Sequence, residues 1–289
     1  MPPGLCRLCS SPELEPHLVV RGSTLERCRS CGFVQVRDQP TPAELRALYG
    51  DGYFARGKYD QELAQRRETE RRLELLRRAA VPAGGRVLDA GCATGDFVAA
   101  GSRRYEMWGL DVSEQATAQA RAKNPEAAAR IFTGFIEEQR FEARSFDAVV
   151  MWDVIEHLWD PRGVLTRLVE HLRPGGALLL STPDIGAATA RVLGSRWAFM
   201  TPPEHLGFFN RDTLRFLLEQ VLGLETAWSE ASGKWANLGF LAYKLRRVFP
   251  ALPAALVDRV REGALGAAAV YVPTADIRYV GAHKRRGRG

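Results

Sequence analysis

Short apolar runs alternate with amphipathic segments along most of the chain. Residues 86–90, 107–110 and 148–151 are mainly apolar, the pattern of short strands buried in a sheet. Helical segments lie between and after them: Ser113 has the side chain of a helix N-cap, and another helix runs from Asp160 to the Pro-Gly-Gly breaker at 174–176. This alternation predicts an α/β domain.

The segment before these strands is more polar. After a proline-containing linker, residues 43–49 predict a short helix and residues 61–80 a longer one. The longer helix has three acid–arginine pairs at a spacing of four, Glu62/Arg66, Glu68/Arg72 and Glu74/Arg78. We expect a solvated face whose charges pair along the helix; an RNA-binding stripe is the alternative.

Charge and composition narrow the class of protein. Hydrophobic residues make up 46% of the 289 positions, and the formal net charge of +6 falls to +2 without Lys284, Arg285, Arg286 and Arg288 of the tail. A near-neutral body argues against a nucleic-acid partner. Residues 1–10 lack the features of a signal peptide, and no run is apolar and long enough to span a membrane. We expect a soluble protein of the reducing cytoplasm.

Two CxxC pairs give a strong metal-binding signal. Cys6 and Cys9 form the first pair, and Cys28 and Cys31 the second, with eighteen residues between them, a spacing typical of a four-thiolate zinc site. The residues between predict a hairpin. Four cysteine ligands leave no open position, so we expect a structural Zn²⁺ that folds a zinc ribbon over residues 1–40. Disulfides are the alternative, disfavoured in a reducing compartment.

A glycine-bounded turn follows the first buried strand. Gly91 and Gly95 border the segment GCATG directly after Asp89 and Ala90, so a ligand can lie against bare backbone at the strand end. Asp111 ends the next strand, where a carboxylate can accept hydrogen bonds from ribose hydroxyls. A nicotinamide-binding Rossmann domain is the alternative, but the GxxxG spacing differs from its GxGxxG.

These motifs resemble those of class I S-adenosylmethionine-dependent methyltransferases. The resemblance covers about residues 50–285 and includes FDAVVMWDVIEHL at 146–158, LRPGG at 172–176 and STPD at 181–184. It implies a Rossmann-like, seven-stranded, mostly parallel sheet with an antiparallel last strand. It also implies S-adenosyl-L-methionine as cofactor and divides the rest of the chain into a linker with helices covering the cofactor site (41–80) and a methyltransferase domain (81–289).

The resemblance also assigns the cofactor contacts. Asp89, Gly91 and Gly95 would border the methionine moiety, Asp111 would hold the ribose, and Gly134 with Phe135 would lie near the adenine. The full expected set is Asp89, Gly91, Cys92, Ala93, Thr94, Gly95, Phe97, Asp111, Val112, Gly134, Phe135 and Trp152. Cys92 is expected to be a small residue of the turn rather than a nucleophile.

Two histidines are candidates for a catalytic base. His157 follows the strand at 148–151, and the near-neutral reference pKa of an imidazole suits it to take a proton from a hydroxyl. Asp153 and Glu156 have the spacing of a helix capping box, which explains both acids structurally. His205, in a PEH segment that related methyltransferases have beside the substrate pocket, is the rival base, with Glu204 as its orienter. Transfer depends mainly on positioning, so activity does not require a strong base.

The C-terminal part contains an insertion. Residues 224–228 and 276–280 resemble the final antiparallel strand pair of the fold, and the 231–275 insertion between them has predicted amphipathic helices at 238–249 and 254–272. The basic residues of these two helices are Lys244, Arg246, Arg247, Arg259 and Arg261. A lid, a homodimer face and peripheral contact with an acidic membrane are the alternatives.

The sequence therefore favours an enzyme that methylates a hydroxyl of a small molecule or sugar. C-methylation of a sugar, rRNA or tRNA methylation, and a non-catalytic zinc-ribbon scaffold are the alternatives. The tetrapeptide DPPY, typical of amino-group nucleic-acid enzymes, is replaced by WDVI at 152–155, which disfavours RNA.

Overall fold

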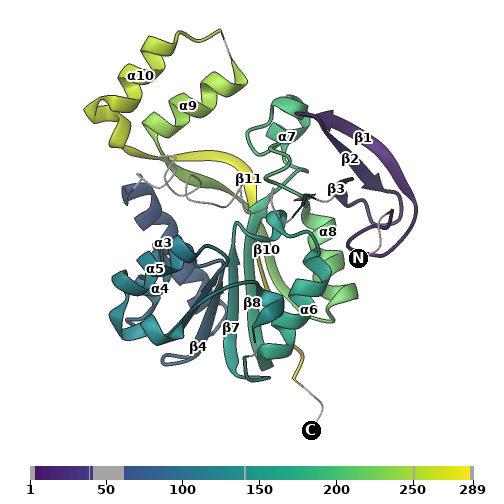
Figure 1. The fold of residues 1–289 in the computed structure, drawn as a ribbon, viewed down its shortest axis with the longest axis vertical. Helices are drawn as coiled ribbons and strands as arrows, with labels where there is room; N and C mark the ends of the chain where they lie inside the picture. The colour runs from purple at the N-terminus through teal and green to yellow at the C-terminus, as the bar shows by residue number, and fades with distance from the viewer. Residues whose placement is uncertain (1–3, 39, 42–61, 140, 250, 287–289) are drawn as a thin grey trace.

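The computed structural model describes residues 4–38, 40–41, 62–139, 141–249 and 251–286. The helix predicted at 43–49, most of the linker and the end of the basic tail lie outside the described residues. Figure 1 shows a central sheet with helices on both sides, a small second sheet formed with the N-terminal strands, and a helical hairpin projecting from one end.

The central sheet has seven strands in the order β10-β11-β8-β7-β4-β5-β6. These strands are β4 (Arg86–Ala90), β5 (Glu106–Asp111), β6 (Ile131–Thr133), β7 (Phe146–Trp152), β8 (Leu172–Pro183), β10 (Glu225–Asn237) and β11 (Ala269–His283). Neighbours from β8 to β6 are parallel. β11, the last strand of the chain, is antiparallel to both β8 and β10. The expected Rossmann-like sheet is confirmed.

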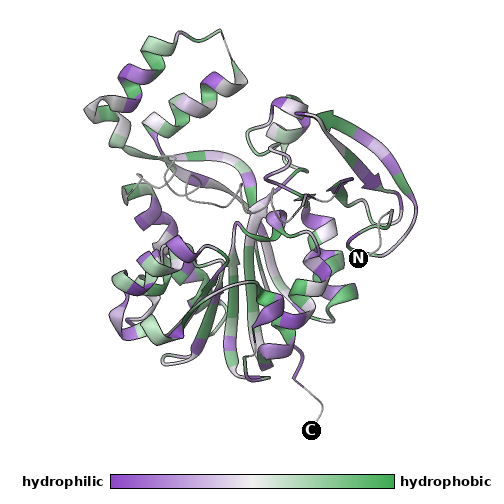
Figure 2. Ribbon diagram, in the orientation of Figure 1, coloured by the Kyte–Doolittle hydropathy of each residue, from purple (hydrophilic) through white to green (hydrophobic). Residues whose placement is uncertain are grey.

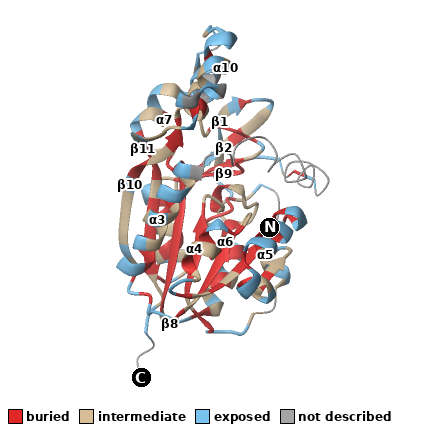
Figure 3. Cartoon of the chain, turned by 90° about the vertical axis from the view of Figure 1, so that its left-hand side faces the viewer, coloured by how far each residue is buried: buried red, intermediate tan, exposed pale blue. Residues whose placement is uncertain are grey.

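Helices cover the sheet on both faces. One face packs against α3 (Glu62–Arg78), α4 (Asp96–Gly101) and α5 (Glu114–Lys123). The other packs against α6 (Pro161–His171), α8 (Arg211–Arg215) and the π-helix η5 (Phe216–Val221). Because both faces are covered, the central strands are apolar along their length (Figure 2) and buried (Figure 3).

Shorter elements complete the chain. They are α7 (Ala188–Leu193) and the 3₁₀ turns η1 (Pro125–Arg130), η2 (Ile136–Glu138), η3 (Ile155–His157), η4 (Gly194–Arg196) and η6 (Ala264–Ala267). The predicted cap at Ser113 is confirmed, and Asp160 and Asn210 also cap helices: each of the three side chains accepts a hydrogen bond from a backbone N–H of the first helical turn.

The charges of α3 do not pair as the sequence predicted. Arg72 binds Asp153 at 2.8 Å, and Arg78 binds Glu230 at 2.7 Å. The buried Glu68 accepts a 2.8 Å hydrogen bond from the hydroxyl of Tyr279. The predicted pairing along the helix was therefore wrong for these residues. Glu68 and Arg72 lie on the side of α3 that packs on the sheet, whereas Glu74 and Arg78 are exposed, as predicted.

The strand pair β10–β11 is longer than predicted. β10 continues to Asn237 and β11 begins at Ala269, so both ends of the presumed helical insertion are strand. Two helices, α9 (Leu238–Val248) and α10 (Ala254–Glu262), remain between them, and the helix expected over 254–272 ends ten residues early. They project beyond the sheet (Figure 1). None of the helices in the described ranges is long and apolar enough to cross a membrane.

The N-terminal strands form the predicted hairpin. β1 (Leu14–Val20), β2 (Ser23–Cys28) and β3 (Val34–Val36) are antiparallel, and a two-residue strand of the main domain, β9 (Gly207–Phe208), adds the fourth strand beside β3. Gly32, directly after the second cysteine pair, has a positive φ of +78°. The module thus shares a sheet with residues far along the chain, and the boundary at residue 40 stays a prediction.

Candidate active site

The turn after β4 brings backbone close to neighbouring side chains. Gly91 has a φ of +98°, and a Cβ there would lie 2.4 Å from a methyl carbon of Val154. Gly95 has a φ of +76°, and a Cβ there would lie 2.8 Å from that of Ala120. Both positions therefore require glycine. The turn leaves backbone exposed at the carboxyl end of β4, where open α/β sheets bind ligands.

Asp89 is a buried acid with an unsatisfied acceptor. Its side chain is 2% exposed, and its Oδ1 atom has no hydrogen-bond partner among the described residues. Burial raises the pKa of Asp89 to about 7; Arg72 opposes the shift and Asp111 adds to it. A buried acceptor without a partner is costly. The chemistry of this atom therefore fits a cationic donor such as the ammonium group of a methionine moiety.

Asp111 closes the turn from the next strand. Its Oδ2 accepts a 2.9 Å hydrogen bond from the Ala93 N–H, and its Oδ1 accepts one of 2.9 Å from the Ser113 N–H. Burial raises its pKa, although these hydrogen bonds work against the shift. Each carboxylate oxygen still has a lone pair, so the group can accept from ribose hydroxyls.

Two apolar side chains beside Asp111 are exposed. Val112 is 44% exposed and Phe135 is 51% exposed. The N–H of Gly134, the residue before Phe135, donates to the Asp111 carbonyl at 2.9 Å. The structure thus places the residues expected around an adenine next to the residue expected at the ribose.

The other residues expected around the cofactor are buried or bonded to neighbouring side chains. Phe97 and Trp152 are buried with ring centroids 5.7 Å apart, edge to face. The Thr94 hydroxyl donates to Asp96 Oδ2 at 2.9 Å. Burial raises the pKa of the Cys92 thiol, which makes it a poor nucleophile. Phe97 and Trp152 belong to the same buried cluster as Cys92 of the turn.

Asp153 does not cap a helix. It has a φ of +57° directly after β7, and its carboxylate accepts hydrogen bonds from Lys234 at 2.7 Å, Arg72 at 2.8 Å and the Ser181 hydroxyl at 2.9 Å. Burial works to raise its pKa, but Lys234 and Arg72 hold it below its ordinary value. The sequence did not predict this cluster, because its members are far apart along the chain.

Glu156 is the second half of the failed capping-box prediction. It is 2% exposed and accepts a 2.9 Å hydrogen bond from the Thr182 hydroxyl. Burial and the nearby Asp153 raise its pKa to about 8. The 3₁₀ turn that contains it, η3, has Val154 at its N-cap position and no side-chain cap.

The two candidate bases lie side by side. The rings of His157 and His205 are 4.8 Å apart and nearly perpendicular, and one donor atom each of Glu156, His157 and His205 lies within 4.8 Å of the others. His157 Nδ1 lies 2.8 Å from the carbonyl oxygen of Glu204. A carbonyl only accepts, so Nδ1 carries the proton and a neutral His157 has its lone pair on Nε2. Glu204 orients His157 through its backbone, whereas we expected its side chain to orient His205.

The four cysteines form one cluster. Their Sγ atoms all lie within 4.8 Å of one another, and the Cys6–Cys31 and Cys9–Cys28 pairs are each 3.5 Å apart. All four are free thiols. A tetrahedral zinc site with Zn–S bonds of 2.3 Å separates its sulfurs by about 3.8 Å, so the donor set and its dimensions fit Zn²⁺.

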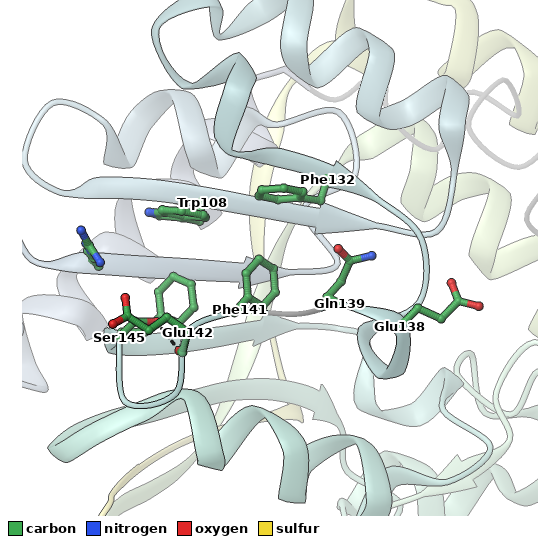
Figure 4. A pocket seen from close by; sticks show the side chains of 9 residues that line it. Trp108, Phe132, Glu138, Gln139, Phe141, Glu142 and Ser145 are labelled. Atoms are coloured by element: carbon green, nitrogen blue, oxygen red, sulfur yellow. Dashed lines mark hydrogen bonds between the residues drawn. The ribbon is translucent and has the colours of Figure 1, made fainter.

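A cavity of about 420 Å³ lies elsewhere (Figure 4). It is lined by Trp108, Phe132 and Phe141, and by Glu138 at the end of η2 and Gln139 directly after it. The Trp108 and Phe132 rings stack 5.9 Å apart. None of the predicted cofactor or catalytic residues lines this cavity, so it is separate from the site at the end of β4.

The strand order, the turn after β4 and the acid ending β5 define a Rossmann-like, S-adenosylmethionine-dependent methyltransferase. Residues 61–226, more than half of the chain, match the family described as a methyltransferase domain. The chain belongs to this family.

Sequence relatives agree with this class. A probable S-adenosylmethionine-dependent methyltransferase of Mycolicibacterium smegmatis is 41% identical over 35% of this chain and 39% of its own length. A ubiquinone biosynthesis O-methyltransferase of Aromatoleum aromaticum is 31% identical over 54% of this chain and 70% of its own length. The chain thus spans from about two fifths to seven tenths of these relatives.

Solved structures share the fold. Magnesium protoporphyrin IX methyltransferase of Synechocystis with bound SAH has a TM-score of 0.55 at 15% identity, covering 84% of this chain and all of its own. The [4+2]-cyclase SpnF has a TM-score of 0.51 at 21% identity, covering 76% of this chain and 81% of its own. At these identities the similarity concerns the fold alone.

Proposed function

We propose that this protein transfers a methyl group from S-adenosylmethionine to a hydroxyl oxygen of a small molecule or sugar. The observation that carries the proposal is the position of His157, with His205 packed against it, just after the carboxyl end of β7, the strand next to β4 in the sheet. Several relatives are named for O-methylation in ubiquinone biosynthesis, which supports an oxygen acceptor on a small molecule.

The cofactor is assigned to the turn after β4. When bound, S-adenosylmethionine supplies a methyl group on a sulfonium. The unsatisfied Oδ1 of Asp89 accepts from the ammonium group of the methionine moiety, and Asp111 accepts from the ribose hydroxyls. Gly91, Cys92, Ala93, Thr94 and Gly95 offer backbone, while Val112, Gly134 and Phe135 hold the adenine. Phe97 and Trp152 support the turn from below.

His157 is the base that the hydrogen bonding favours. Its Nδ1–H donates to the Glu204 carbonyl, which orients the ring and makes Nε2 the nitrogen whose lone pair can accept a proton from the acceptor hydroxyl. His205 packs against it and is the alternative base. Either histidine would add to a rate acceleration that comes chiefly from holding the two reactants close together and aligned.

The four-cysteine cluster is assigned a structural Zn²⁺. Cys6, Cys9, Cys28 and Cys31 complete a tetrahedral coordination shell, so no position remains for water or substrate. The metal supplies folding free energy to a small segment that has little core of its own. Metal content of the purified protein, measured by mass spectrometry, tests this assignment: one zinc per chain supports it, and none contradicts it.

An acceptor screen tests the reaction itself. The zinc-loaded protein is incubated with S-adenosylmethionine and panels of phenols, aliphatic alcohols and nucleotide sugars, and products are located by mass and by NMR. Transfer to oxygen supports the proposal. Transfer to carbon or to RNA, or cofactor binding without transfer to any hydroxyl, contradicts it.

A further inference from the structure

The two cysteine pairs have an arginine at the same position but in opposite environments. Arg7 follows Cys6, and Arg29 follows Cys28. The Arg29 side chain is 68% exposed and pairs with Glu15. Arg7 is 2% exposed. An arginine is almost never so deeply buried without a specific set of partners, so the two arginines have different roles.

Arg7 donates to backbone carbonyls from three segments and to the side-chain oxygen of Gln35. Its Nη2 atom donates to the carbonyls of Val36 and Leu206 at 2.8 Å each, and its Nη1 atom donates to that of Trp159 at 3.4 Å. The guanidinium also lies over the Trp159 ring, 3.9 Å from its centroid. One side chain thus joins the cysteine module to two segments of the methyltransferase domain.

Those two segments carry the histidines of the proposed site. Leu206 follows His205 directly, and its N–H donates to the Glu156 carbonyl at 2.8 Å. Trp159 lies two residues after His157. The partners of Arg7 are therefore next to both candidate bases. The cofactor turn, by contrast, makes no hydrogen bond to Arg7 among those of the described residues.

Further contacts hold the same segment against the module. β3 pairs with β9 through Val34–Phe208 and Gln35–Gly207. The Phe33 and Phe209 rings lie 4.9 Å apart. A Cβ at Gly207 would lie 2.7 Å from the Phe33 ring, so the module and the loop pack without space between them.

The positive charge of Arg7 makes its burial against the histidine segments depend on the metal centre. No carboxylate among the described residues forms a salt bridge with Arg7, and its hydrogen bonds go to neutral oxygens. A Zn²⁺ with four thiolates has a net charge of −2. Because Arg7 lies between Cys6 and Cys9 in the chain, the loaded centre adds a countercharge to those of Asp160 and Glu26, which favour the charged guanidinium from a longer distance.

We infer that Arg7 is a positioning residue that links the metal-loaded cysteine module to the segments bearing His157 and His205. Metal loading then orders the acceptor side of the site and leaves the cofactor turn unchanged. The inference rests on the proposed function for the role of the histidines. Its test measures hydrogen exchange and not turnover. The inference can therefore fail while methyl transfer is confirmed, and methyl transfer can fail while the inference is confirmed.

The test compares Arg7→Lys and Arg7→Gln with Arg29→Gln in the zinc-loaded full chain. Amide hydrogen exchange is followed by mass spectrometry. We expect exchange in residues 155–160 and 204–209 to be roughly tenfold faster or more in both Arg7 variants. Neither Lys nor Gln has the planar guanidinium whose two Nη atoms donate to both segments. Residues 86–97 and the Arg29→Gln protein should exchange as in the wild type. Unchanged exchange at 204–209 overturns the inference.

A spectroscopic signal separates positioning from general loosening. The chain has five histidines, so their ring protons can be assigned by NMR. The Nδ1–H of His157, held by the Glu204 carbonyl, should give a protected resonance in the wild type and in Arg29→Gln. It should exchange rapidly in the Arg7 variants while S-adenosylmethionine affinity stays within about twofold. A retained resonance, or an equal loss of cofactor affinity, contradicts the inference.

Metal removal provides the second arm, which is decisive if the Arg7 variants do not fold. Chelation of the wild-type protein should speed exchange in residues 5–36 and in 204–209, with the cofactor turn still protected. If chelation speeds exchange in 5–36 alone, or equally in 86–97, the module does not position the histidine segment.

Discussion

Lys234 Nζ lies 2.7 Å from Asp153 Oδ2, which joins the middle of β10 to the residue directly after β7. Arg72 of α3 shares the same carboxylate oxygen at 2.8 Å, and Ser181 of β8 donates to the other. Three elements that cover or form the sheet thus meet at one acid beside the proposed site. The left-handed backbone of Asp153 is maintained by these contacts.

Replacing Lys234 with Met should destabilise the protein. Asp153 would keep Arg72 and Ser181 but lose one of its two cations, so we expect a loss of about 1–3 kcal/mol, less than for a fully buried pair because Lys234 is partly exposed. Urea unfolding measures the change. Arg77→Met, which removes an exposed pair with Glu74, is the control and should cost under about 0.5 kcal/mol. Equal effects of the two substitutions would contradict the account.

The raised pKa of Glu156 predicts a pH-dependent stability. The folded protein holds a proton on Glu156 up to about pH 8, whereas the ordinary pKa is 4.5. The group's contribution is therefore fully present below about pH 4.5 and is lost as pH rises toward 8, with a slope of up to about 1.4 kcal/mol per pH unit. Asp89 contributes with the same sign up to about pH 7.

Glu156→Gln should flatten that dependence, because the amide oxygen can still accept from Thr182 and nothing titrates. Urea midpoints at several pH values between about 5 and 8 give the slope. Glu114→Gln, at an exposed position of α5, should leave the slope as in the wild type. A Glu156→Gln protein with the wild-type slope would show that Glu156 is ionised in the folded state.

Cofactor affinity should depend on the ionisation of Asp89. Below its pKa of about 7 the carboxyl is protonated and attracts an ammonium group less, so S-adenosylmethionine affinity should rise with pH, by up to about tenfold per unit, and level off above about pH 7. Asp89→Asn should bind more weakly and without this rise. Calorimetry over the pH range measures it; an unchanged pH profile in Asp89→Asn would place the ammonium elsewhere.

The two histidines should differ in turnover. If His157 is the base, His157→Ala should lower kcat by about 10²–10⁴-fold, and His205→Ala should have a smaller effect through the orientation of its neighbour. His171→Ala, on the far end of α6, is the control. The reverse order would make His205 the base, and equal, small effects would mean that positioning alone suffices.

Local sequence predicted the sheet and its turn well. The runs at 86–90 and 148–151 lie in β4 and β7, and the cap at Ser113 forms as expected. These features depend on a few neighbouring residues, such as a polar side chain at a helix start or glycines in a turn.

Features that depend on distant partners were missed. Asp153 and Glu156 have the spacing of a capping box, but they bind residues from β8, β10 and α3. β9 has only two residues and no strand pattern of its own. The burial of Arg7, and not of Arg29, could not be predicted from two nearly identical CRxC segments, since it depends on what packs against each knuckle.

The most direct test of the account is calorimetric titration of the zinc-loaded protein with S-adenosylmethionine and S-adenosylhomocysteine, for the wild type, Asp111→Ala and the exposed control Asp212→Ala. We predict micromolar binding to the wild type and the control, and a loss of about 1–3 kcal/mol in Asp111→Ala, the range for losing charge-assisted hydrogen bonds. Unchanged affinity in Asp111→Ala would remove this residue from the ribose site. No binding to the wild type would contradict the cofactor site and favour a scaffold.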